Sequence, residues 1–244
     1  ALHPRSCWRV CMAHTRLTLD TLRRLSLLAS LPDETLGELC THMQLTRYSK
    51  RDIVIQKGSH GYDLLFLLNG RLQVVDVTDD GREVGLSFIL PGSFFGELSI
   101  IDNLPRSASV LALTTADVIS LPKEIALRLF YHTPVIAEMI VKHLAKVIRQ
   151  ASAYRALLSI GNAFQRVCAL LCLVKQVMPS GLHVVEQLPT QQEIAIMINT
   201  SRETVSRALN ELSDQGVIEK DQRRLLIRQP EELDRMASMD VAAP

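Results

Sequence analysis

Apolar residues recur with a helical period early in the chain and again in its second half, and they form short runs in between. The stretch from Leu17 to Glu38 has helical periodicity and predicts helix there, with a break at Leu31-Pro32-Asp33. The apolar face of this stretch consists of Leu19, Leu22, Leu25 and Leu28. Helix is therefore expected ahead of the short runs.

The short runs lie between turn residues at close intervals. They are Ile53–Ile55, Leu64–Leu68, Leu72–Val77, Val84–Leu90, Ala108–Leu113 and Val118–Leu121. Strands of this length and spacing are typical of an antiparallel roll or barrel. Asn69-Gly70 and Asp80-Gly81 are predicted to be hairpin turns, because asparagine, aspartate and glycine tolerate positive φ.

A long helical pattern begins after Thr133-Pro134, and its apolar positions alternate by four and three residues. They are Ile140, Leu144, Val147, Ala151, Tyr154 and Leu158. This spacing predicts a seam that needs a partner, and the simplest partner is the same helix of a second subunit. A homodimer is therefore expected; the alternative is an amphipathic helix packed on its own domain.

Two short helices are predicted after a further helix at Phe164–Val177. Thr190 and Glu193 form a capping box at the start of the first, and Asn199-Thr200 make a tight connection to the second, which begins at Ser201. Two helices joined so closely are typical of a helix-turn-helix.

The second short helix has one apolar and one polar face. Its buried stripe is predicted to be Val205, Ala208, Leu209 and Leu212, which leaves Arg202, Glu203, Ser206 and Arg207 on the outer face. Arginine can bind guanine O6 and N7, and glutamate can accept from cytosine N4, so this face can read base edges in a major groove. The alternative is a solvated face with pairs such as Glu203–Arg207.

A two-stranded wing is predicted after these helices. Val217–Lys220 and Leu225–Arg228 read as its strands, with Arg223 and Arg224 at the tip, where they can contact phosphates.

The segment Phe94–Ser99, followed by Pro105–Ser109, carries the other candidate chemistry. Gly96 permits close approach of the backbone to an anion, Arg106 can donate a planar fork to two phosphate oxygens, and Ser107 can add a hydroxyl. Glu97 would repel a phosphate, so its expected task is to accept from a ribose hydroxyl. This set predicts a phosphodiester site; the alternative is a surface Arg–Glu pair beside a turn.

Composition limits the remaining possibilities. The net charge is +1, so any attraction to nucleic acid must come from a local patch. The odd number of cysteines, 5, favours a reducing compartment, and the expected location is the cytoplasm.

Cys168 and Cys172 lie one helical turn apart and are interpreted as core residues rather than metal ligands. The scattered histidines form no cluster with ligand spacing, so no metal and no enzyme are expected, with a cyclic-nucleotide hydrolase as the enzymatic alternative.

Phe94–Ser99 and Pro105–Ser109 resemble the phosphate-binding cassette of cyclic-nucleotide-binding domains, and Ser201–Arg207 resembles the recognition helix of the Crp/Fnr superfamily. The resemblance covers about Leu17 to Arg228. It implies a transcription regulator that binds a palindromic operator with half-sites close to TGTGA, binds a cyclic nucleotide and contacts RNA polymerase. The implied nucleotide-binding residues are Gly96, Glu97, Leu98, Arg106, Ser107, Ala108 and Ser152. The implied base contacts are Arg202, Glu203 and Arg207, and the implied phosphate contacts are Thr190, Gln192, Ser201 and Thr204.

Two positions depart from the family pattern. Ser206 stands where the family has glycine, and it can add a phosphate or base contact. Ala151 and Ser152 stand where cyclic-AMP-responsive members have a Thr–Ser pair that bonds the adenine, so one hydroxyl is missing here. Cyclic AMP is the expected effector, with cyclic GMP, cyclic di-GMP, an apo-active regulator and a redox or gas sensor of the same superfamily as alternatives.

The expected fold class is α+β, with an N-terminal antiparallel β-roll, a long dimerisation helix and a C-terminal winged helix-turn-helix. The expected divisions are an extension at 1–16, a cyclic-nucleotide-binding roll at 17–133, the dimerisation helix at 134–160, the DNA-binding domain at 161–230 and a tail at 231–244.

Overall fold

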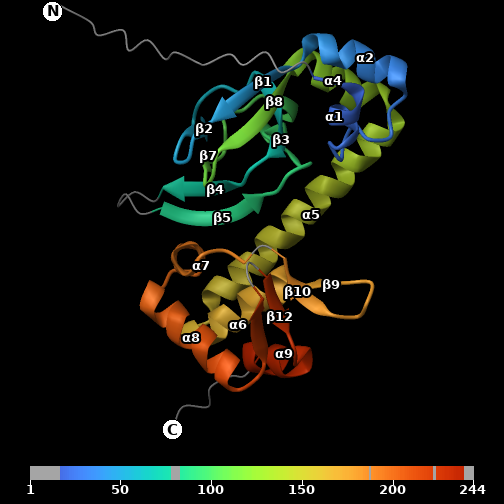
Figure 1. Ribbon diagram of the computed structural model, residues 1–244. Coiled ribbons are helices and arrows are strands. Elements are labelled where there is room, and N and C mark those ends of the chain that lie inside the picture. The colour runs from blue at the N-terminus through green and yellow to red at the C-terminus, as the bar shows by residue number, and fades with distance from the viewer. Residues whose placement is uncertain (1–16, 78–82, 187, 222–223, 239–244) are drawn as a thin grey trace, which may run out of the picture. The chain divides into compact units, whose positions relative to one another are not determined.

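The computed structural model describes residues 17–77, 83–186, 188–221 and 224–238 (Figure 1). The expected 1–16 extension and the predicted Asp80-Gly81 turn lie outside these residues. The chain divides into two units: the first reaches to His143, and the second begins at Leu144 and includes the short stretch Glu83–Gly85. The boundary between the units therefore falls within the long helix.

The first unit is built around two four-stranded sheets. The strands are β1 (Gln44–Tyr48), β2 (Ile53–Ile55), β3 (Asp63–Asn69), β4 (Leu72–Val77), β5 (Glu83–Ile89), β6 (Phe94–Phe95), β7 (Ser109–Ala112) and β8 (Ala116–Pro122). One sheet has the order β1-β8-β3-β6 and the other β2-β7-β4-β5. The pairs between β1, β3, β6 and β8 are antiparallel, as are those of β7 with β2 and β4, which confirms the predicted roll. β1 and β6 were not predicted.

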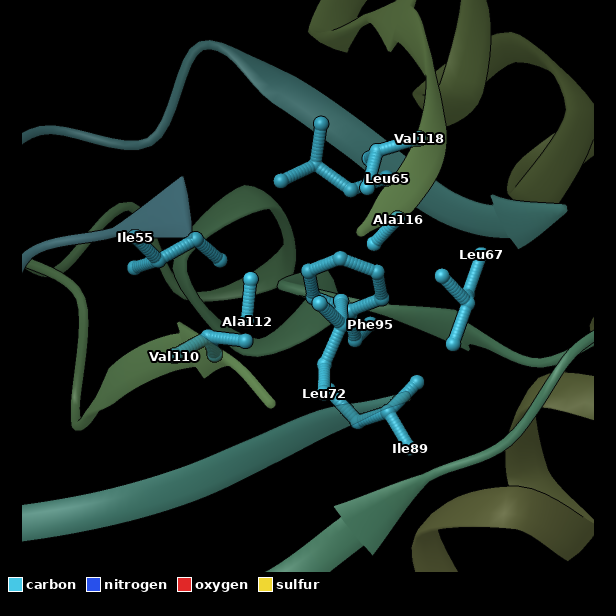
Figure 2. Packing of buried hydrophobic residues seen from close by; sticks show 10 residues of the cluster. All are labelled: Ile55, Leu65, Leu67, Leu72, Ile89, Phe95, Val110, Ala112, Ala116 and Val118. Atoms are coloured by element: carbon cyan, nitrogen blue, oxygen red, sulfur yellow. The ribbon is translucent and has the colours of Figure 1, made fainter. Parts of the chain in front are cut away.

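Apolar side chains from both sheets fill the roll (Figure 2). Leu67 and Leu72 are fully buried, and Phe95 brings an aromatic ring into the same cluster from β6. The cluster consists of Ile55, Leu65, Leu67, Leu72, Ile89, Phe95, Val110, Ala112, Ala116 and Val118. Truncating one such leucine to alanine typically costs about 2–5 kcal/mol. This core fixes β6, and thereby the residues that follow it.

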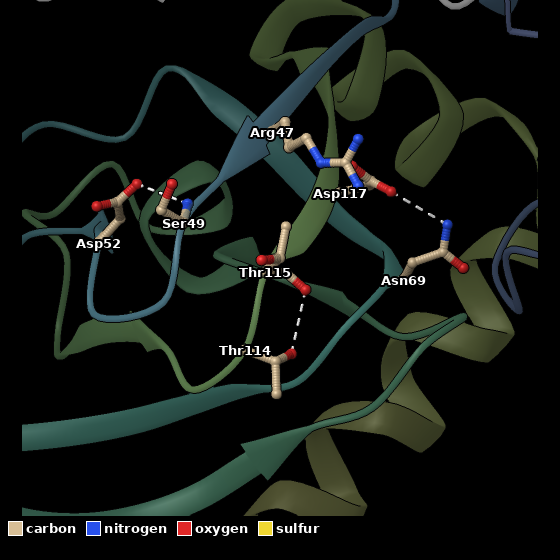
Figure 3. Close-up of polar contacts among 7 residues, drawn as sticks. All are labelled: Arg47, Ser49, Asp52, Asn69, Thr114, Thr115 and Asp117. Carbon is tan, nitrogen blue, oxygen red and sulfur yellow. Dashed lines mark hydrogen bonds and ion pairs between the residues drawn. The ribbon is translucent and has the colours of Figure 1, made fainter.

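Polar contacts fix the turns at one end of the roll (Figure 3). The Ser49 backbone N–H donates to Asp52 Oδ2 at 2.7 Å, and Asn69 Nδ2 donates to Asp117 Oδ2 at 3.2 Å.

The Asn69-Gly70 hairpin prediction is wrong, because β3 and β4 belong to different sheets and only Gly70 has positive φ, 93°. A Cβ at Gly70 would lie 2.4 Å from the backbone oxygen of Thr115, so this turn needs glycine for a crossing between sheets.

Helices α1 (Leu19–Arg23), α2 (Asp33–His42), α3 (Glu97–Ile101) and α4 (Lys123–His132) complete the first unit. The predicted first helix is shorter than expected, because α1 ends at Arg23 and turns follow. Leu25 and Leu28 are nevertheless fully buried, so the apolar spacing reflects burial beyond the helix itself.

Helix α5 (Pro134–Ser159) matches the predicted long helix, but its apolar residues divide differently from the expected seam. Ile140 is 6% exposed within the first unit, and the Tyr154 hydroxyl donates to the backbone oxygen of Met197 at 3.3 Å within the second. Val141 and Ile148, one heptad apart, are 65% and 66% exposed. The exposed stripe is therefore offset by one position from the predicted seam.

The second unit combines helices with a small sheet. Its elements after α5 are α6 (Ala163–Val174), β9 (Gln176–Val177), β10 (His183–Val185), α7 (Gln191–Met197), α8 (Arg202–Asp214), β11 (Ile218–Asp221), β12 (Arg224–Ile227) and α9 (Pro230–Ser238). The sheet has the order β11-β12-β10-β9. The expected tail carries α9, whose Leu233 is fully buried where α9 packs against α6. The folded domain thus extends beyond residue 230.

Helix α6 contains both core cysteines. Cys168 is fully buried, and burial raises its pKa to about 12. Cys172 is partly buried beside Asp234, and burial again is the main cause that raises its pKa to about 12. The interpretation of Cys168 as a core residue is confirmed. None of the helices in the described ranges has the length and apolar character needed to span a bilayer.

Candidate functional site

Gly96 forms the junction between β6 and α3. It is the N-cap of α3 and has φ of 81°, in the left-handed region. A Cβ at this position would lie 2.2 Å from Nη1 of Arg106. Glycine is therefore required at this position for two reasons: the backbone conformation and the close approach of the guanidinium.

Arg106 lies at the centre of the candidate site and is 8% exposed. Its Nη1 donates to the backbone oxygen of Gly96 at 2.6 Å, and its Nη2 donates to the backbone oxygen of Asp63 at 2.7 Å. Burial lowers the pKa of Arg106, and the nearby Asp63 and Glu97 carboxylates oppose that shift. A guanidinium remains charged in proteins, so the site holds a fixed cation whose planar fork suits two oxygen acceptors.

The backbone around Arg106 is tied to the loop before β3. The Arg106 N–H donates to the oxygen of Ser59 at 2.8 Å, and the Gly58 N–H donates to the oxygen of Arg106 at 2.9 Å. A Cβ at Gly61 would lie 2.1 Å from Ser99 Oγ and 2.9 Å from Cζ of Arg106. Gly61 therefore makes room for the guanidinium, a role that the sequence pattern did not indicate.

Glu97 is the first residue of α3 and is 6% exposed. Its Oε1 lies 3.5 Å from Nε2 of His143 on α5. The His143 ring packs against the ring of Phe94, with 4.4 Å between the centroids. His143 is separated from the cassette by more than thirty residues, and no sequence signal pointed to it.

The other predicted nucleotide-binding residues differ in their surroundings. Ser107 is exposed, Leu98 is 39% exposed, and Ala108 is partly buried. Ser152 is exposed on the stretch of α5 that belongs to the second unit. The structure thus brings Gly96, Glu97 and Arg106 into one cluster, with Ser107 directly beside it in sequence.

A cavity of about 290 Å³ in the roll is also lined by Arg106. Its polar lining includes Tyr48, His60 and Asp63. Burial raises the pKa of Asp63, and the charge of Arg106 opposes that shift. Of the predicted nucleotide-binding residues, only Arg106 lines this cavity. Across the described residues, no group of three or more His, Cys, Asp or Glu side chains could hold a metal ion.

The second candidate site is the pair α7 and α8. The capping box is confirmed: Thr190 Oγ1 accepts from the Glu193 N–H at 3.2 Å, and the Glu193 side chain accepts from the Thr190 N–H at 2.7 Å. Ser201 Oγ accepts from the Thr204 N–H at 3.1 Å and caps α8. Asn199 has φ of 50° in the turn between them, which asparagine adopts more readily than most residues. Local side-chain bonds therefore set both helix starts.

The outer face of α8 is polar, as predicted. Val205, Ala208, Leu209 and Leu212 are buried, whereas Arg202, Glu203 and Arg207 are exposed and Ser206 is partly buried. A backbone N–H at the helix start and the Ser201 hydroxyl lower the pKa of Glu203. The predicted phosphate contacts Thr190, Gln192 and Ser201 are exposed, and Thr204 is partly buried. Thr190 Oγ1 accepts from the Glu193 N–H and can still donate its own proton to a phosphate, whereas the Ser201 hydroxyl already contacts Glu203 and Thr204 Oγ1.

Arg166 on α6 supports the helix pair and was missed by the sequence interpretation. Its Nη1 donates to the backbone oxygens of Ile160 and Gly161, at 2.7 and 3.2 Å. Its Nη2 donates to the oxygen of Asn199 at 3.4 Å. One side chain thus joins the end of α5 to the turn between α7 and α8.

The predicted wing is formed by β11 and β12, which pair antiparallel with Asp221 opposite Arg224. Nε of Arg224 lies 3.2 Å from Oε2 of Glu186, and the Arg224 side chain is 54% exposed. The other predicted tip residue, Arg223, lies outside the described residues.

Comparisons with known proteins find matches for the two parts of the chain that carry these candidate sites. A family profile for the cyclic nucleotide-binding domain matches residues 45–132, and one for the Crp-like helix-turn-helix domain matches residues 165–236. The chain is 33% identical over 179 residues to the cyclic AMP receptor protein of Thermus thermophilus, covering 73% of this chain and 81% of that one. It is 28% identical over 222 residues to the CRP-like cAMP-activated global transcriptional regulator of Mycobacterium tuberculosis, covering 89% and 99%. The solved structure of FixK2 from Bradyrhizobium japonicum shares the fold, with a TM-score of 0.68 at 20% identity over 81% of this chain and 98% of that one.

Proposed function

This chain belongs to the Crp/Fnr family of cyclic-nucleotide-binding transcription regulators, and we propose that it is a homodimer whose DNA binding is controlled by cyclic AMP. The observation that carries the proposal is the cluster of Gly96, Glu97 and Arg106 inside the roll. It combines a buried cation, a left-handed glycine that permits close backbone approach and a buried carboxylate. A cyclic nucleotide has a group for each: its phosphate suits the cation, and its ribose hydroxyl suits the carboxylate.

In the proposed binding mode, the phosphate replaces backbone carbonyls as the acceptor for Arg106. The guanidinium already points both Nη groups at oxygen atoms, 2.6 and 2.7 Å away, so a phosphate offers it acceptors of the same kind with more charge. Ser107 adds a hydroxyl, and Glu97 accepts from the ribose. The family pattern assigns the contact with the base to Ser152.

Cyclic AMP is favoured as the effector because two relatives that align over most of this chain are named for it. Ala151 predicts fewer hydrogen bonds to the adenine edge, since it offers no hydroxyl where the family pattern has one. We therefore expect a smaller preference for cyclic AMP over cyclic GMP than a complete Thr–Ser pair would give. The nucleotide is proposed to be an effector, not a substrate, so the protein is not proposed to be an enzyme.

The exposed stripe on α5 supports a homodimer. Val141 and Ile148 present apolar side chains one heptad apart on a helix of 26 residues, and burying them against a second copy removes that surface from water. In such a dimer, nucleotide binding favours one arrangement of the helix pair. The two α8 helices then lie about 34 Å apart and meet successive major grooves of a palindromic operator. RNA polymerase is the proposed partner on the bound DNA.

The proposed effector is tested by calorimetric titration with cyclic AMP, cyclic GMP and cyclic di-GMP. We expect saturable binding with one cyclic AMP per chain and the tightest affinity for that nucleotide. Tighter binding of cyclic di-GMP or cyclic GMP would replace cyclic AMP as the effector. Absence of binding by all three, together with visible absorption of anaerobically purified protein, would favour a redox or gas sensor.

A further inference from the structure

His143 contacts the nucleotide cluster from the long helix. Its Nε2 lies 3.5 Å from Oε1 of Glu97, and the two side chains are 29% and 8% exposed. Its ring also packs on Phe94, with 4.4 Å between centroids and 45° between the planes. The imidazole is therefore held between an aromatic ring of β6 and a buried carboxylate of α3.

This arrangement addresses an energetic problem at Glu97. A carboxylate with so little exposure is stable only when polar partners replace water. Arg106 contributes charge from one side, and His143 lies at ion-pair distance from Oε1 on another. A carboxylate has two oxygens with about four lone-pair sites, so a contact at Oε1 leaves Oε2 able to accept from a ligand.

We propose that His143 is a positioning residue of the nucleotide site: it holds Oε1 of Glu97 so that the second oxygen accepts the ribose 2′-hydroxyl. This inference rests on the proposed function, in which Glu97 is the ribose acceptor. It assigns the discrimination between a ribonucleotide and its 2′-deoxy analogue to a pair of residues rather than to Glu97 alone.

The test measures the affinities of cyclic AMP and 2′-deoxy cyclic AMP for the full chain and for two variants. His143→Leu removes the contact, and we expect the preference for cyclic AMP over the deoxy analogue to fall by roughly 3- to 10-fold. The deoxy analogue has no 2′-hydroxyl to bond to Glu97, so its affinity for this variant should stay within about twofold of its affinity for the unmodified chain. His143→Gln keeps an N–H donor, and we expect it to restore most of the preference.

Lys142→Gln is the matched control on the same helix. Lys142 pairs with Glu138 at 2.5 Å with its side chain 74% exposed, so its loss should leave both affinities unchanged. Equal weakening of both nucleotides in His143→Leu would mean a general structural role and would overturn the inference. An unchanged preference in that variant would overturn it as well, while leaving cyclic AMP binding intact. If the unmodified chain binds neither nucleotide, the proposed function fails first and the inference fails with it.

Discussion

Arg106 in the roll and Arg202 on α8 are both expected to recognise a nucleotide ligand, and their surroundings differ completely. Arg106 is 8% exposed, is hydrogen-bonded to two backbone carbonyls and has a glycine beneath its guanidinium. Arg202 is exposed at the first turn of a helix whose start is fixed by the Ser201 cap. A site for a small anion thus depends on the tertiary structure around it, whereas a site for DNA depends on a rigid helix that presents free side chains.

This difference predicts how each site responds to substitution. A change in the roll cluster should affect ligand binding and folding together, because the same groups serve both. A change at Arg202 or Arg207 on the outer face of α8 should affect DNA binding and leave folding unchanged, because both side chains are exposed.

The largest effect is expected from Arg106→Leu. Removing the cation from a buried phosphate site should weaken cyclic AMP binding by about 100-fold or more, since a desolvated charge pair loses one partner. Calorimetric titration measures this change. Arg106→Lys keeps the charge but loses the planar fork, so its affinity should lie between those of the other two proteins. Arg202→Ala, which lies on α8, should bind the nucleotide normally; a matching loss there would contradict the separation of the two sites.

Gly96→Ala tests the backbone part of the same cluster. The added Cβ would lie 2.2 Å from Arg106 Nη1, at a residue with φ of 81°, so we expect the free energy of unfolding to fall by about 1–3 kcal/mol. Gly37→Ala is the control, because a Cβ there meets no atom within 4 Å and the residue lies inside α2. That substitution should stabilise the chain by roughly 0.5–1 kcal/mol. Denaturant unfolding of both variants gives the comparison, and similar effects of the two substitutions would refute it.

Arg202→Ala tests the exposed site. We expect operator binding to weaken by about 1–3 kcal/mol and the base preference to relax at one position of each half-site. The midpoint of thermal unfolding should not change, because the side chain is exposed. Arg224→Gln at the wing should instead weaken binding to all DNA sequences alike. A selection experiment with randomised half-sites distinguishes these results, and an unchanged preference in Arg202→Ala would remove this residue from base recognition.

The smallest effect is expected from Thr190→Ala. It removes the side-chain acceptor that caps α7, at a typical cost of about 1 kcal/mol in the free energy of unfolding. Thr190→Asn offers another capping oxygen and should recover most of that loss. Chemical denaturation measures both variants; equal losses would mean that the threonine contributes by packing and not by its hydroxyl.

The same contrast explains what could be predicted from the sequence. The caps at Thr190 and Ser201 act within three residues, so the local pattern predicted both helix starts. The cassette residues Gly96, Glu97 and Arg106 were found through their order along the chain, and the structure brings them together. Short strands such as β6 and β9, with two residues each, are below the length at which alternation can be recognised.

Contacts between residues that are distant in the sequence could not be predicted from local patterns. Asn69-Gly70 has the composition of a hairpin turn, but the pairing of β3 with β8 and β6 leads the chain to cross between sheets there. His143 belongs to a helix with heptad-like spacing, and nothing local relates it to Glu97. Gly61 likewise gains its role only from Ser99 and the guanidinium of Arg106, which pack closely against it. Each of these depends on tertiary structure that a local pattern does not encode.

The coupling between nucleotide and operator is measured by how tightly the chain binds a palindromic DNA fragment with TGTGA half-sites, with and without saturating cyclic AMP. Fluorescence anisotropy at fixed salt concentration gives both constants. We expect the nucleotide to change DNA affinity by roughly 5- to 150-fold and Arg106→Leu to abolish the change. Equal DNA affinity with and without the nucleotide in the unmodified chain would rule out nucleotide control of DNA binding.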